Sequence, residues 1–276
     1  VGPLRHQFHS PDASQPQLVQ PETAVRLRFN QNKDTPLPPE EPTGENPPAG
    51  AVLDYVLPEG FSGTAKLEIL SSDGAVVRSF DSEIVPSQAR ARIYFAETWL
   101  GSPQALPAGE GHHRFVWNLR HLPPPTLESR YSIAAVPGIP TPILPEGAFV
   151  LPGDYTVKLT AGGQTITRTL SVQLDPRVDL QQADLASLLD FQQEVKTLLT
   201  RVVSLHEEIE TGNEEARAAS VASVPRKVAD ALTELAIDLE HSDMPPTSSQ
   251  RALFNYESER FEQAENDWKG LRVHFP

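Results

Sequence analysis

The hydrophobic residues of this chain change their spacing once, at Asp175-Pro176-Arg177. From about residue 50 to residue 174, apolar and polar side chains alternate, which is typical of β-strands with one buried face. After residue 177 the apolar side chains recur every three to four residues, which is typical of amphipathic helices. The sequence therefore predicts a mixed β plus α chain, with strands first and helices second.

Seven segments of the first part alternate and are separated by turn residues. They are 51–57, 65–70, 75–80, 91–95, 113–119, 155–160 and 164–172. Asp73-Gly74 and Gly162-Gly163 stand where tight turns would form two hairpins, because glycine adopts positive φ without a steric cost. Seven such strands predict an immunoglobulin-like or fibronectin-like β-sandwich. The connection 121–150, with seven prolines, is expected to add no core strand.

The second part contains three series of apolar residues at seven-residue spacing, which predict three antiparallel helices. The first helix, at about 180–211, is expected to be capped by Asp179 with Gln182 and to end at Gly212. Its apolar seam consists of Leu188, Phe191, Val195, Leu198, Val202, Leu205 and Ile209. A second helix is expected from about Pro225, and a third after a cap at 247–250. We predict a bundle that packs within a monomer, with a dimer through the first helix as the alternative.

Prolines divide the chain further, since ten of the 27 lie in residues 1–50 and nine in residues 101–150. Each proline fixes its own φ and restricts the residue before it, so residues 34–42 are expected to be extended. Within 24–29, Val25, Leu27 and Phe29 would share one face of a short strand. The predicted organisation is a proline-rich strap at 1–49, a β-sandwich at 50–175 and a helical bundle at 176–276.

The composition excludes several classes of protein. The absence of cysteine excludes disulfide scaffolds and thiolate metal sites. The formal net charge is -14, of which residues 178–276 contribute -10, so nucleic acid is not an expected partner. No run of about 20 apolar residues and no basic start followed by an apolar run is present, so neither a membrane span nor a signal peptide is expected within the chain.

Catalytic, metal and cofactor sites are not expected from the residue patterns. His112 and His113 are adjacent, but neighbours in a strand point to opposite faces and cannot both bind one metal. Glycoside hydrolysis requires two carboxyl groups on either side of one bond. The pair Glu40-Glu41 lies among prolines and the pair Glu207-Glu208 on a polar helix face, so neither is expected to form such a site.

Aromatic residues provide the remaining candidates. Trp117 is interpreted as a core residue, and Tyr155 as a corner tyrosine whose hydroxyl ties a strand to the preceding loop. Tyr94, Trp99 and Tyr131 fall outside these patterns. If the β domain has a ligand surface, we expect it at these three residues.

Several segments resemble a known family. They are 34–55, with its Asn46-Pro47-Pro48-Ala49-Gly50-Ala51 strap, 113–120, 151–159 and Asp175-Pro176-Arg177. They are similar to the region after the β-propeller in bacterial proteins with sialidase-like (BNR) or sortilin-N-terminal-like repeats, often labelled glycosyl hydrolase or photosystem II assembly factor-like. The propeller itself, with its Ser-x-Asp-x-Gly-x-x-Trp turns, is missing. The resemblance implies the C-terminal part of an exported, periplasmic or extracellular bacterial protein whose hydrolase activity would belong to the absent propeller.

Three functions are compatible with these observations. The first is a non-catalytic accessory module that contacts its own propeller or other proteins. The second is a carbohydrate-binding module, because sandwiches often present aromatic side chains to glycans. The third is an enzyme in its own right, and it ranks last because no catalytic motif or carboxylate site is expected.

Overall fold

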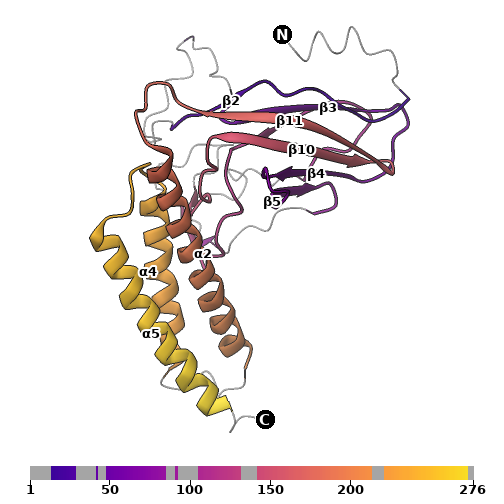
Figure 1. The fold of residues 1–276 in the computed structure, drawn as a ribbon. Helices are drawn as coiled ribbons and strands as arrows, with labels where there is room; N and C mark the ends of the chain where they lie inside the picture. Colours follow the sequence, from indigo (N-terminus) through magenta and orange to yellow (C-terminus); the bar gives the residue numbers. More distant parts are fainter. Residues whose placement is uncertain are drawn as a thin grey trace.

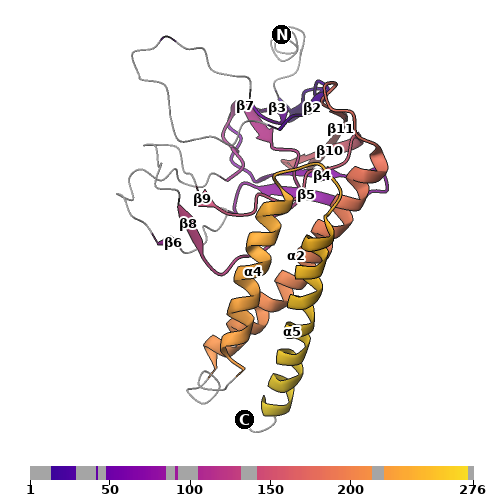
Figure 2. The same cartoon turned by 90° about the vertical axis from the view of Figure 1, so that its left-hand side faces the viewer.

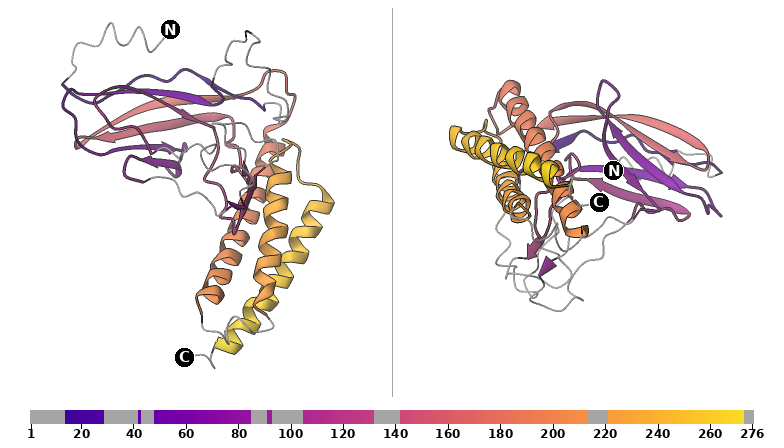
Figure 3. Two further views of the ribbon diagram at one scale, coloured as in Figure 1. Left: turned by 180° about the vertical axis from the view of Figure 1, so that it is seen from behind. Right: turned by 90° about the horizontal axis from the view of Figure 1, so that it is seen from below.

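The computed structural model describes residues 14–28, 42, 48–84, 91–92, 105–131, 142–212 and 221–272. Its strands are β1 (Gln17–Leu18), β2 (Ala24–Arg26), β3 (Ala51–Leu57), β4 (Ala65–Leu70), β5 (Val76–Asp81), β6 (Ala91–Arg92), β7 (Gly111–Trp117), β8 (Ser129–Tyr131), β9 (Pro142–Ile143), β10 (Gly153–Ala161) and β11 (Gln164–Leu174). Its helices are α2 (Gln182–Thr211), α4 (Ser223–Leu239) and α5 (Ser248–Arg272). The fold is mixed β plus α, and the helices extend away from one end of the sheets (Figures 1 and 3).

Two sheets make up most of the β part. One has the strand order β2-β11-β10-β4-β5 and the other β1-β3-β7. Both predicted hairpins are confirmed, since β4 pairs with β5 and β10 with β11 in antiparallel fashion. The proline-rich N-terminal segment contributes one strand to each sheet, because β1 pairs with β3 and β2 pairs in parallel with β11. The segment is therefore part of the sheets and does not merely cover them.

One apolar core lies between these two sheets. It joins Tyr55 and Trp117 of one sheet to Ile69, Val157 and Leu170 of the other. The Trp117 side chain is fully buried, as expected, and its indole N–H donates to the carbonyl of Arg120 at 3.0 Å.

The predicted role of Tyr155 is confirmed. Its hydroxyl donates to the carbonyl of Leu151 at 2.8 Å, and its ring meets Trp117 edge-on, with centroids 5.9 Å apart. This bond ties the start of β10 to the loop before it.

The prediction of seven strands is wrong in number, because the described residues contain eleven. The short strand expected within 24–29 corresponds to β2, and the missed strands are β1, β8 and β9. They have two or three residues each, too few to show an alternating pattern. Two of them, β8 and β9, belong to the connection 121–150 and pair with each other in a third small sheet with β6. Figure 2 shows this sheet beside the helices, apart from the larger sheets.

The three helices pack around a second apolar core, and all seven predicted seam residues of α2 are buried in it. α4 contributes Val228, Leu232, Leu235 and Leu239, and α5 contributes Phe261, Ala264 and Trp268. α4 contacts both α2 and α5 more extensively than these two contact each other. The α2 seam is thus covered by helices of the same chain. Among the described helices, none is both long and apolar enough to cross a membrane.

Some of the predicted helix ends are confirmed and one is wrong. Thr247 and Gln250 form the expected reciprocal cap, with the backbone N–H of Thr247 donating to Gln250 Oε1 at 2.8 Å. α2 ends before Gly212, also as expected. The predicted cap by Asp179 is wrong, because α2 begins at Gln182 and the residue before it makes no side-chain cap bond. Asp179 lies too far upstream to accept an N–H of the first turn.

Candidate functional site

The predicted aromatic surface is mostly outside the described residues. Tyr94 and Trp99 fall in a part of the chain that the structure does not describe, and so do Glu40 and Glu41. Tyr131 ends the short strand β8 of the third sheet. A ligand surface at Tyr94, Trp99 and Tyr131 therefore stays a prediction.

Both residues of the histidine pair, and Glu208 of the helical carboxylate pair, have structural partners. His112 Nε2 lies 3.4 Å from Asp54 Oδ1, whereas the ring of His113 packs on Tyr55 and bonds the carbonyl of Gly109. Across the described ranges, no group of three or more histidine, aspartate or glutamate residues is placed to hold a metal ion. Both Glu207 and Glu208 are exposed, and Glu208 accepts the indole N–H of Trp268 at 3.0 Å.

A cluster of arginine and carboxylate side chains joins the sheets to the helices. The guanidinium groups of Arg26, Arg28 and Arg120 surround the ring of Phe149, at 5.0, 5.2 and 3.8 Å from its centroid. Asp243, just beyond α4, accepts hydrogen bonds from both Arg26 and Arg28. We call Arg26, Arg28, Arg120, Glu146, Phe149, Glu240 and Asp243 the junction cluster.

Burial in the junction cluster perturbs its charges. Arg26 is only 4% exposed, and burial lowers its pKa. Burial also acts to raise the pKa of Asp243, but hydrogen bonds and charge from Arg28 and Arg26 hold that pKa below its usual value. Asp243 therefore stays ionised and neutralises the arginines from the other side of the junction.

Glu240 occupies the other half of the junction cluster, at the C-terminal end of α4. Its two carboxylate oxygens accept the backbone N–H groups of Glu146 and Gly147, each at 2.8 Å. Arg120 Nη1 lies 3.6 Å from Glu240 Oε2 and donates to the carbonyl of Gly147 at 2.6 Å. Burial outweighs these contacts and raises the pKa of Glu240 to about 7.

Gly147 allows this arrangement. Its φ is 96°, and a Cβ atom there would lie 2.3 Å from the carbonyl oxygen of His121. Any other residue at position 147 would displace the backbone that holds Glu240.

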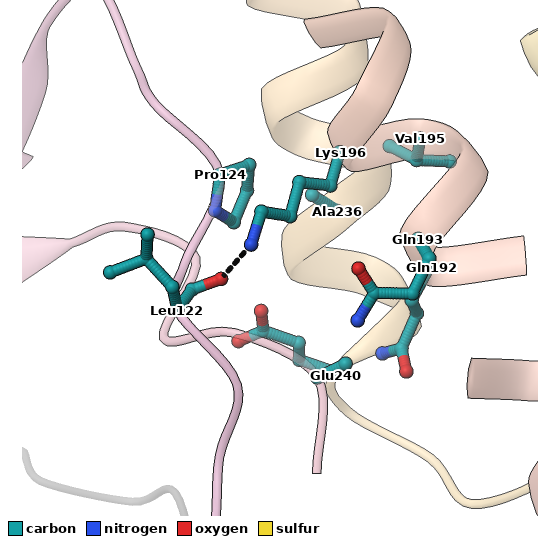
Figure 4. A pocket seen from close by; sticks show the side chains of 9 residues that line it. Leu122, Pro124, Gln192, Gln193, Val195, Lys196, Ala236 and Glu240 are labelled. Carbon is teal, nitrogen blue, oxygen red and sulfur yellow. Dashed lines mark hydrogen bonds between the residues drawn. The ribbon is translucent and has the colours of Figure 1, made fainter. Parts of the chain in front are cut away.

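A small cavity adjoins Glu240 (Figure 4). Leu122, Pro124, Gln192, Lys196 and Glu240 are among its lining residues, and its volume is about 10 Å³. That volume suits about one water molecule. The Lys196 ammonium closes one side and donates to the carbonyl of Leu122 at 2.7 Å.

A larger open groove of about 480 Å³ lies between α2 and α5. Its lining includes Leu198 and Phe254, which are apolar, and Asp190, Glu194 and Arg201, which are charged. Arg201 pairs with Glu265 at 3.2 Å. Asp190 and Glu194 have no ion pair among the described residues, so the uncompensated charge of the groove is negative.

A third concave region of about 210 Å³ lies between residues 19–24 and the outer face of β3 and β7. The Asp54 side chain is 3% exposed there and accepts two hydrogen bonds from Arg114, from Nε at 3.0 Å and from Nη2 at 3.1 Å. The lining of the pocket is mostly apolar, and Arg114, which is half exposed, brings its charge to the surface there.

The sequence did not predict the junction cluster. Of the apolar face expected within 24–29, Val25 and Leu27 are only half buried and Phe29 lies outside the described residues, whereas Ala24 and Arg26 of β2 are buried. The sequence shows that Arg26 and Arg28 would share one face of a strand, but no residue near them in the sequence indicates that a carboxylate would bind them. No protein-family model, curated protein or solved structure matches this chain, so these comparisons leave the resemblance to sialidase-like proteins as a prediction.

Proposed function

We propose that this chain is a non-catalytic accessory module that docks a basic, partly apolar segment of another protein domain in the groove between α2 and α5. The observation that carries the proposal is the groove itself, which combines the apolar Leu198 and Phe254 with the uncompensated carboxylates Asp190 and Glu194. Lysine or arginine side chains on the partner would meet these carboxylates, while apolar side chains would cover Phe254.

The charge of the whole helical part supports a basic partner. Residues 178–276 have a formal charge of -10, which attracts cationic surfaces from a distance of about 10 Å at moderate salt. The junction cluster supports the same proposal, because charge-assisted bonds to Glu240 and Asp243 connect the helical part to the β part. A fixed helical surface loses less conformational entropy on binding than a tethered one.

The wider setting follows from the resemblance. The chain would be the C-terminal part of an exported bacterial protein, its two larger sheets would form an immunoglobulin-like or fibronectin-like sandwich, and the docked segment would belong to the propeller or to another protein. Two sheets around one core, with Trp117 and the corner tyrosine Tyr155, support the sandwich assignment.

We expect the isolated chain to select basic helical peptides. A displayed library would carry the same apolar positions with either lysine- and arginine-rich or glutamate-rich polar faces. The basic peptides should bind, and Glu194→Lys should weaken them by about tenfold or more. Glu207→Lys makes the same charge change at an exposed α2 position that does not line the groove, and it serves as the control. Equal weakening by both variants, or no preference for basic peptides, would contradict the proposal.

A carbohydrate-binding module is the second candidate function. It is favoured by the pocket at Asp54 and Arg114, since such paired planar groups suit the hydroxyls of a sugar. A glycan array on the isolated chain tests it. Selective glycan binding that Arg114→Lys weakens would place this candidate first, and no binding would remove it.

A further inference from the structure

The groove between α2 and α5 is the open side of the helical bundle. α2 and α5 both run away from the sheets, whereas α4 runs back toward them (Figures 1 and 2). α4 contacts each of its neighbours more extensively than α2 and α5 contact each other, and the groove of about 480 Å³ lies between these two parallel helices. An up-down-up-down bundle of four helices would have a helix there, antiparallel to both.

The groove follows the helix axes. Its α2 lining extends from Asp190 to Arg201 through residues that recur every three or four positions, so they share one face of α2. This stretch covers about three turns, or roughly 16 Å. On the opposite wall, Phe254 and Ser258 of α5 are one turn apart. A helix of this span presents a continuous stripe of side chains to the groove, whereas an extended segment has only about five residues there, which alternate between two faces.

Charge is unevenly distributed along the groove. Asp190 and Glu194, at the end nearer the sheets, are exposed and have no ion pair within the described part of the chain. Arg201, at the other end, has a carboxylate partner on α5. Arg251 of α5 lies over the Phe191 ring, 4.8 Å from its centroid, and is not among the described lining residues. The groove is therefore most negative at the end nearer the sheets.

Helix polarity and this charge distribution favour the same direction. The C-terminal end of a helix carries a partial negative charge, which lysine or arginine in the last turn stabilises. A helix antiparallel to α2 ends near the sheets, so its last turn meets Asp190 and Glu194. Its basic side chains would then neutralise both these carboxylates and the end of their own helix. A helix parallel to α2 would place its last turn beside Arg201 instead.

We infer that the segment docked in the groove is a helix of about three turns, antiparallel to α2 and α5, with lysine or arginine in its last turn opposite Asp190 and Glu194. Its apolar side chains, three or four positions apart, cover Leu198 and Phe254. The inference rests on the proposed function, to which it adds the conformation, the direction and the charge order of the partner.

Two capped peptides of about 18 residues test the charge order, since shorter helices are marginal in water. Both have the same apolar seam, but one carries two lysines in its last turn and the other carries them in its first turn. Calorimetric titration of the chain should show about tenfold tighter binding of the first peptide. This preference should be lost in Glu194→Lys and kept in Glu207→Lys, which separates the contact from any difference in helicity between the peptides.

A nitroxide on the first peptide shows its direction without altering the chain. At the C-terminus of the peptide, the label should broaden the amide resonances around Asp190, and at the N-terminus those around Arg201. Proline in the middle of the peptide should weaken binding by about tenfold or more, because it breaks a helix.

The outcomes distinguish this inference from the proposed function. Equal affinity of the two lysine peptides, the opposite order of broadening, or unchanged affinity of the proline peptide would overturn the inference alone. If neither lysine peptide binds, both are overturned. A doubled mass of the unliganded chain in light scattering that Glu194→Lys abolishes would assign the groove to a second copy of the chain and would also overturn the inference.

Discussion

Replacing Asp243 by alanine should lower the free energy of unfolding by about 3–5 kcal/mol, the usual cost of breaking a buried ion pair by removing one partner. Asp243 accepts from Arg26 and Arg28, and its side chain is 10% exposed against 3% for that of Arg26. Without the carboxylate, two guanidinium groups remain in the junction cluster around Phe149 with less negative charge to neutralise them. The penalty is the cost of these uncompensated charges.

Equilibrium unfolding in urea, followed by circular dichroism, measures this loss. Asp230→Ala removes an exposed carboxylate from α4 and should change the stability by less than about 0.5 kcal/mol. The triple replacement of Arg26, Arg28 and Asp243 by Met, Met and Leu should recover most of the loss, because it removes the charges together. If Asp243→Ala costs no more than Asp230→Ala, the junction cluster does not hold the sheets to the helices.

The second large effect concerns Glu240 and His121, which should make the free energy of unfolding depend on pH in opposite directions. The pKa of Glu240 is about 7 in the folded chain and 4.5 without its surroundings. The contribution of Glu240 to the free energy of unfolding is therefore greatest below pH 4.5 and is lost as the pH rises to 7. The pKa of His121 is about 4 in the folded chain and 6.5 without its surroundings. The contribution of His121 to the free energy of unfolding is therefore greatest above pH 6.5 and is lost as the pH falls to 4. Each group contributes at most about 3 kcal/mol, and less for the more exposed His121. Between pH 4.5 and 6.5 the two dependences largely cancel.

Single substitutions should separate the two dependences. In Glu240→Gln the unfolding free energy should increase with pH between 4.5 and 6.5 relative to the unaltered chain, by up to about 1.4 kcal/mol per pH unit, because the contribution of His121 is no longer opposed by that of Glu240. In His121→Gln it should decrease over the same range. His241→Gln replaces an exposed histidine beside α4 and serves as the control. Profiles of the same shape in all these variants would show that neither group titrates as described.

The parts of the fold that sequence predicts are those governed by neighbours along the chain. The seam from Leu188 to Ile209 and the strand with Trp117 show their buried faces as local patterns, and both are buried as expected. The conformation of Tyr155 was also predictable, because its acceptor is Leu151, four residues away.

The junction cluster depends instead on distant residues. Arg26 is buried because Asp243, 217 residues later, meets it, and no local rule places an arginine inside a sheet.

The 217 residues between Arg26 and Asp243 also set an order of assembly during synthesis. At 5–20 residues per second, a ribosome needs roughly 10–40 s to extend the chain from Arg26 to Asp243. The hairpins β4–β5 and β10–β11 involve neighbouring segments and can form earlier, while β2 can join the sheet only after β11 has emerged. Until residue 243 has emerged, Arg26 of β2 and the nearby Arg28 lack the carboxylate of Asp243, so a nascent chain halted before that point would expose a cationic edge that chaperones can recognise.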